Sequence, residues 1–215
     1  LSNSGQMQAQ GGSLTLQANG ALSNATGGDI YGTGAVNLQA ASIANAGALE
    51  AGQALTLTSG GALLNSGKAQ ADAGDLIAKA GATLDNSGTL SATGQLGLNA
   101  AQALGNTGSV VANGAVSLSG ASLTNAGTVQ GGQGLALTAQ GDLVNRGKLY
   151  ALGNGWTAQA GGAFSNESSG DVYGAGAVNV RCWRHDAADD FGANGQFVGA
   201  VCSALSSRER SGLFP

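Results

Sequence analysis

Few side chains in this sequence could carry out chemistry, and the acidic residues are the first candidates for catalysis. A site that cleaves a glycosidic bond needs two carboxyl groups, or one carboxyl group with Lys or Arg, converging on that bond. Upstream of the last 35 residues, acids concentrate only at Asp72, Asp75 and Asp85, whereas Asp29 and Asp171 stand apart. A solvated turn accounts for the first group, so the sequence predicts no catalytic residues and no enzyme.

A second group is His185 with Asp186, Asp189 and Asp190, whose side chains carry ligand atoms for a divalent metal. His185 is the only histidine in the chain, although imidazole is the commonest metal ligand. Glycine triplets such as Gly32-Thr33-Gly34 are frequent, but none opens a helix, as a phosphate-binding loop requires. We therefore predict no metal site and no cofactor.

Charge and hydropathy exclude two further classes of partner. The 215 residues carry only 8 Lys plus Arg and a net charge of −4, which gives no basic surface for a phosphate backbone. No apolar run approaches the roughly 18 residues of a membrane-spanning helix. We therefore expect no nucleic acid and no membrane span. The opening Leu1-Ser2-Asn3 lacks a Met and a basic signal region, which indicates an internal or mature fragment.

The elements that position these side chains come from a repeat. One asparagine recurs at intervals of 19 to 21 residues, with a large apolar residue two positions before it and usually a glycine two positions after it. Apolar residues then alternate with polar ones, which is typical of β-strands, and no window has helical spacing. The nine asparagines are Asn3, Asn24, Asn45, Asn65, Asn86, Asn106, Asn125, Asn145 and Asn166.

A unit of about 20 residues built from short strands cannot bury its own apolar face, so it must stack on its neighbours. The sequence therefore predicts an all-β fold: a right-handed parallel β-helix of about nine coils over residues 1–180, roughly 43 Å long at about 4.8 Å per coil. Each asparagine is expected to lie inside and to bond to the equivalent amide one coil away, forming a ladder. Most of the 35 glycines within residues 1–180 are expected at sharp corners, where glycine tolerates a left-handed backbone.

The Leu-x-Asn-x-Gly pattern resembles the haemagglutinin repeats of filamentous-haemagglutinin-type exoproteins, and Leu123-Thr124-Asn125-Ala126-Gly127-Thr128-Val129 matches them closely. The resemblance covers residues 1 to about 180. It implies a β-helical shaft, export by two-partner secretion through an outer-membrane transporter, and a role as an adhesin or as the stalk of a contact-dependent growth inhibition toxin. No secretion domain or toxin domain is recognisable, which indicates a shaft fragment.

The pattern stops after Val180, and residues 181–215 form an atypical tail that holds both cysteines and the only histidine. Three interpretations remain open: a degenerate terminal coil that caps the solenoid, the start of another domain, or a change of reading frame, which we favour. Solenoid ends do need capping. The 20-residue spacing of Cys182 and Cys202 equals one coil, but the neighbouring residues do not keep the apolar alternation.

One row of outward residues could contact a sugar or a protein, although ordinary outward strand residues would look the same. The row comprises Tyr31, Glu50, Gln70, Ser91, Val111, Gln130, Tyr150 and Tyr173. Taken with the family resemblance, the repeat predicts a structural segment of a secreted or cell-surface bacterial adhesin, which the resemblance implies would contact an unknown receptor on a host or neighbouring cell. A carbohydrate-acting β-helical enzyme is the alternative.

Overall fold

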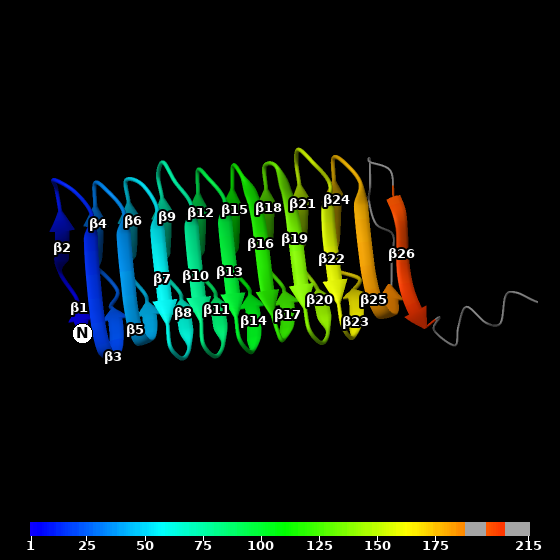
Figure 1. Cartoon of the computed structure of the whole chain (residues 1–215), viewed down its shortest axis with the longest axis horizontal. Coiled ribbons are helices and arrows are strands. Elements are labelled where there is room, and N and C mark those ends of the chain that lie inside the picture. The colour runs from blue at the N-terminus through cyan, green and yellow to red at the C-terminus, as the bar shows by residue number, and fades with distance from the viewer. Residues whose placement is uncertain (188–196, 205–215) are drawn as a thin grey trace, which may run out of the picture.

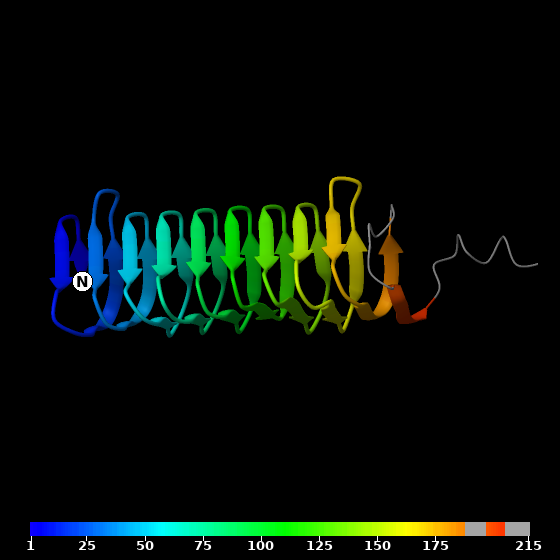
Figure 2. The ribbon, with the colours of Figure 1, turned by 90° about the horizontal axis from the view of Figure 1, so that it is seen from above.

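The computed structural model describes the backbone of residues 1–187 and 197–204 and the side chains of residues 1–183. All 26 elements in these residues are β-strands, and every pairing between them is parallel. The chain winds into an extended right-handed solenoid (Figure 1), and the view from above shows the coils as successive rungs along one axis (Figure 2). The predicted parallel β-solenoid of about nine coils is thus confirmed.

One wall of the solenoid is a sheet of nine short strands, one from each coil. Each strand begins shortly after the glycine of the repeat, where the backbone becomes extended. The strands are β2 (Gln6–Ala9), β4 (Asp29–Gly32), β6 (Ala48–Ala51), β9 (Lys68–Ala71), β12 (Thr89–Ala92), β15 (Ser109–Ala112), β18 (Thr128–Gly131), β21 (Lys148–Ala151) and β24 (Asp171–Gly174).

The other wall is a sheet of 17 strands that bends at a corner, so that most coils contribute two strands to it. The longer strands are β3 (Leu14–Asn24), β5 (Val36–Asn45), β7 (Leu55–Ser59), β10 (Leu76–Ala80), β13 (Leu96–Ala100), β16 (Ala115–Gly120), β19 (Gly134–Ala139), β22 (Trp156–Ala160), β25 (Val178–Ala187) and β26 (Phe197–Ala204). The short strands that carry ladder asparagines are β1 (Ser2–Asn3), β8 (Leu63–Asn65), β11 (Leu84–Asn86), β14 (Ala103–Asn106), β17 (Ser122–Asn125), β20 (Leu143–Asn145) and β23 (Ala163–Asn166). In β3 and β5 one strand continues around the corner and carries the asparagine itself.

The register of the strands places like residues on like residues. Leu84 pairs with Leu63 on one side and Leu104 on the other, and Asn86 pairs in the same way with Asn65 and Asn106. Because side chains alternate between the two faces of a strand, this register sends the same residue types inward in every coil. The repeat of the sequence therefore becomes a set of columns parallel to the axis.

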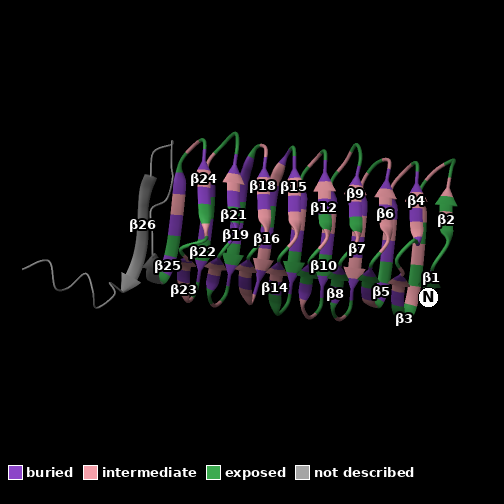
Figure 3. Ribbon diagram, turned by 180° about the vertical axis from the view of Figure 1, so that it is seen from behind, coloured by how far each residue is buried: buried purple, intermediate pink, exposed green. Residues whose placement is uncertain are grey.

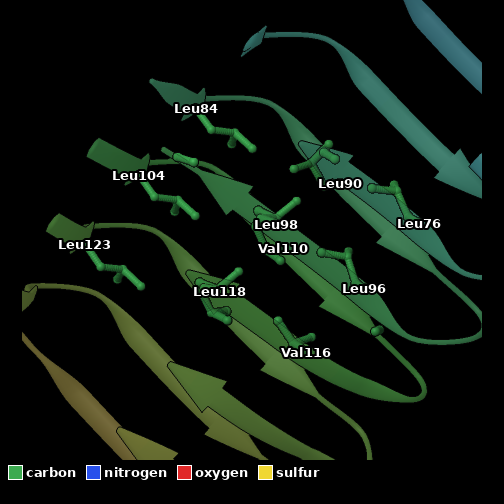
Figure 4. Close-up of a cluster of buried hydrophobic side chains, with 14 of the residues drawn as sticks. Leu76, Leu84, Leu90, Leu96, Leu98, Leu104, Val110, Val116, Leu118 and Leu123 are labelled. Atoms are coloured by element: carbon green, nitrogen blue, oxygen red, sulfur yellow. The ribbon is translucent and has the colours of Figure 1, made fainter. Parts of the chain in front are cut away.

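The core consists of apolar side chains that stack in continuous columns along the axis, enclosed by the two sheets. Leu84, Leu90, Leu96 and Leu98 are at most 2% exposed. Figure 4 shows them stacked with their equivalents in the neighbouring coils, and Figure 3 shows how buried and exposed residues alternate along each strand. Burial of an apolar side chain is worth about 1.5–3 kcal/mol, so stacking supplies the stability that a single coil lacks.

The strands continue beyond residue 180, where the composition changes. In β25, residues up to Arg181 pair with β22, and residues from Arg184 to Ala187 pair with β23. Ala187 thereby occupies the register position that follows Asn166, so the ladder has no further asparagine there. Strand β26 then pairs with β25, with Cys202 in register with Cys182. The separate character of residues 181–215 stays a prediction.

Candidate functional site

The asparagines line the inside of the corner between the two walls. All nine are buried, with at most 4% of each residue exposed. The Nδ2 atom of each donates to the Oδ1 atom of the next, at 2.9 Å from Asn3 to Asn24 and at 2.8 Å from Asn86 to Asn106. The column ends where Asn166 donates to the carbonyl of Gly170 at 3.0 Å. The amides thus form one hydrogen-bonded chain along the axis.

Seven of the nine amides, those from Asn3 to Asn125, also donate to a carbonyl on a strand of the nine-stranded sheet and so connect the two walls. The Nδ2 atom of Asn86 lies 3.3 Å from the carbonyl oxygen of Gly88 in its own coil and 3.2 Å from that of Ser109 in the next. The Oδ1 atom of Asn86 accepts from Asn65 at 2.8 Å. The buried amide of Asn86 therefore has hydrogen-bond partners for both its donor and its acceptor atoms, as buried polar side chains require, and it adds a second donor to the Gly88 carbonyl, which already accepts from the Ser109 N–H at 2.8 Å.

The glycine two residues after the asparagine is required, in every coil from Gly47 to Gly147, for a reason that the sequence did not indicate. A left-handed backbone was the predicted reason, but only Gly27 and Gly134 have a positive φ among the described residues, and no ladder asparagine has one. A Cβ built at Gly88 would instead lie well inside 3.0 Å of the carbonyl oxygen of Gly67 in the coil below. Close approach of two backbones, rather than backbone conformation, explains these glycines.

The outward aromatic row ends in a small polar cluster. Tyr150 and Tyr173 are register partners on β21 and β24, with ring centroids 6.1 Å apart and an edge-to-face arrangement. The ammonium group of Lys148 lies 5.8 Å from the centre of the Tyr150 ring. The Tyr150 hydroxyl donates to the carboxylate of Asp171, and this hydrogen bond, followed by burial and the negative charge of Asp171, raises the pKa of Tyr150.

Replacing Asp171 with Asn should lower the pKa of Tyr150 towards its ordinary value, because the mutation removes both the acceptor carboxylate and its charge. Ultraviolet titration of the phenolate band measures this directly, with Tyr150→Phe identifying the band that belongs to Tyr150. The matched control is Asp29→Asn, at the equivalent position of β4. An unchanged titration in the Asp171→Asn variant would show that the two side chains are not bonded in solution.

The acids considered for catalysis do not converge. Asp72 accepts from the Gln70 side chain, and Asp75 accepts from the backbone N–H of Gln95 at 2.7 Å. Asp85 lies on a different strand, β11, and points outward. Asp72 and Asp75 thus share the turn between β9 and β10, where each has a hydrogen-bond partner, whereas Asp85 lies on a separate strand.

No group of three or more metal-ligating side chains occurs in the described part of the chain. The group His185, Asp186, Asp189 and Asp190 lies outside the residues whose side chains are described. None of the described residues belongs to a helix that is long and apolar enough to cross a bilayer.

These features define the class of protein, a parallel β-solenoid built from asparagine-ladder coils. A family model for the haemagglutinin repeat matches residues 123–181, the stretch that holds Asn125, Asn145 and Asn166. The match and the solenoid together fit a filamentous-haemagglutinin-type repeat protein. Among the curated proteins and the solved structures compared with the chain, none matches it.

Proposed function

We propose that this chain is a passive shaft segment of a secreted or surface-bound bacterial adhesin, which holds a distal tip away from the cell. The observation that carries the proposal is the unbroken register of the ladder and core columns from Asn3 to Asn166. Backbone hydrogen bonds then run along the axis in every coil, and bending requires several of them to break at once. A rod of this kind acts as a rigid spacer that fixes the distance between its two ends.

The family match supports the same role, since the resemblance implies export by two-partner secretion through an outer-membrane transporter and contact with a receptor on another cell. Sparse charge and the absence of proline before Pro215 suit a chain that crosses a membrane unfolded and folds outside. Asp72, Asp75 and Asp85 lie in one turn and on a separate strand, so the proposed function includes no catalytic activity.

Removing whole coils tests whether the segment acts as a rigid spacer. Deletion of residues 45–124 joins Ala44 to Asn125 and so preserves the Leu-x-Asn-x-Gly register while removing four coils. Spin labels at Thr15 and Asn179 should lie about 38 Å apart in the full chain and about 19 Å apart after the deletion, with narrow distributions, at about 4.8 Å per coil.

The same pair of chains, displayed between an outer-membrane anchor and an epitope tag, connects length to function. The tag should stay accessible to antibody through a surface polysaccharide layer with the full shaft and lose access with the shortened one. A flexible Gly-Ser linker of the same number of residues is the control. Broad distances that ignore coil number, or release of reducing ends from a polysaccharide, would contradict a passive shaft.

A further inference from the structure

Two columns of outward side chains run along the longer strands of the 17-stranded sheet. The register aligns the first column from Thr15 to Asn179 and the second from Gln17 to Arg181. We call this surface the polar face. It is formed by strands β3, β5, β7, β10, β13, β16, β19, β22 and β25.

The two columns, whose side chains are all described, contain no carboxylate, although the chain has 12 acids and only 8 Lys plus Arg. Hydroxyl and amide side chains dominate both columns, and the charged members are Lys79 and Arg181, which are both exposed. Asp75 lies at the turn before β10, where its Oδ1 atom already accepts from the Gln95 N–H at 2.7 Å. The electrostatic bias of this face is therefore opposite to that of the whole chain.

The polar face has a hollow where small residues occupy the first column. Between Ile77 and Thr157 the column passes through Gly97, Ser117 and Ala136, which leave a trough between two larger side chains. The trough has a volume of about 550 Å³, within the range of about 300–1,000 Å³ that small-molecule sites occupy. It runs across the strands and hence along the axis of the solenoid.

Polar groups flank the trough on both sides. Lys79, Asn99 and Ser119 of the second column line one side, and Gln95 lines the other. A second hollow of about 450 Å³ follows on the same face, lined by Gln159, Asn179 and Arg181 among others. Taken together, the two hollows have Lys79 towards one end and Arg181 towards the other, with amide and hydroxyl side chains between these two cations.

We propose that the polar face binds an acidic oligosaccharide, with sugar rings in the trough and uronic-acid carboxylates paired with Lys79 and Arg181. Amide and hydroxyl side chains can both donate to and accept from sugar hydroxyls. Lys and Arg form charge-assisted hydrogen bonds with carboxylates, and no carboxylate in either lining opposes them. Bound sugar would lie parallel to the shaft and would not be cleaved, because no pair of acids faces the trough.

An extended peptide fits this face less well than a saccharide. A peptide strand gains its affinity from unpaired backbone groups at a sheet edge. The strands beneath the trough, β13 and β16, are each paired on both sides, so their backbone groups already bond to neighbouring coils. Recognition here must come from side chains, and these are of the kind that suit sugars.

Titration of the full chain with hexagalacturonate tests the proposal, with its methyl ester as the uncharged ligand and amide chemical shifts as the readout. We expect saturable binding that perturbs residues of β13, β16 and β19 and that weakens with added salt. Ala136→Tyr, which fills the exposed floor of the trough, should weaken binding more than about tenfold, and Lys79→Gln about tenfold, as expected for one hydrogen bond to a charged group.

Matched controls lie elsewhere on the same shaft. Thr15→Tyr makes the same kind of change in the same column but outside the trough, and Lys148→Gln removes an exposed charge from the other sheet. Both should bind like the unmodified chain. If Ala136→Tyr fails to fold, judged by its urea midpoint, Ser117→Gln fills the same floor with a flexible side chain.

Three results would overturn the proposal: no saturable binding, binding that survives the filling variants, or equal affinity for the methyl ester. Each of these leaves the shaft proposal intact, since a rigid spacer needs no ligand along its side. The shaft proposal fails on the distance measurements instead, so the two outcomes can be told apart.

Discussion

Replacing Gly88 with Ala is expected to destabilise the chain by about 3 kcal/mol or more, at the upper end of the range for overpacking. The new Cβ would press on the carbonyl oxygen of Gly67, which accepts a hydrogen bond from the Thr89 N–H at 2.9 Å. Neither backbone can move without disturbing the coil beyond it. Urea unfolding, followed by circular dichroism, measures the loss.

Gly97→Ala is the matched control for this prediction. The added Cβ would meet only the Cδ1 atom of Ile77, at 3.1 Å, which is the end of a flexible side chain. Alanine also restricts the unfolded chain more than glycine does, so this variant should change the stability by less than about 1 kcal/mol. Equal urea midpoints for the two variants would show that the coils are not packed as closely as the structure has them.

Replacing Asn86 with Leu is expected to cost roughly 1–3 kcal/mol, because the substitution leaves buried polar partners unpaired. Asn65 loses its acceptor and Asn106 loses its donor, each at 2.8 Å, and the carbonyl of Ser109 loses a partner at 3.2 Å. A break in the middle of the column affects the coils on both sides.

Asn99→Leu makes the same chemical change at an exposed position of β13, so it separates the ladder from general effects of the substitution. We expect the Asn99 variant to unfold at nearly the unmodified urea concentration and the Asn86 variant at a clearly lower one. Amide hydrogen exchange at Thr107 and Gly108, which donate to the Asn86 carbonyl, should accelerate only in the Asn86 variant. If the Asn86 variant keeps its urea midpoint, its amide does not belong to a buried network.

The two residues of the Asn-x-Gly step have different physical roles, although they share a turn. The asparagine supplies donors and an acceptor that the corner needs, and the glycine supplies the space that lets neighbouring corners approach. Both requirements recur in every coil, which explains why the two residue types recur together. The changes in the free energy of unfolding caused by mutations at the two positions are therefore expected to add only when the mutated residues lie in coils that do not touch.

Much of this architecture was determined by the sequence itself. In a solenoid, a fixed spacing along the chain becomes direct contact in space, so the column partners of Asn86 and Leu84 could be read from their intervals. Alternation at every second residue also determined which side chains face inward. The tertiary structure alone decided how closely two corners approach at Gly67 and Gly88, that Tyr150 meets Asp171 of the next coil, and that Gly97, Ser117 and Ala136 leave a trough. The reason is that these features depend on distances between backbones in different coils and on the volumes of adjacent side chains, which the spacing of residues along one chain does not contain.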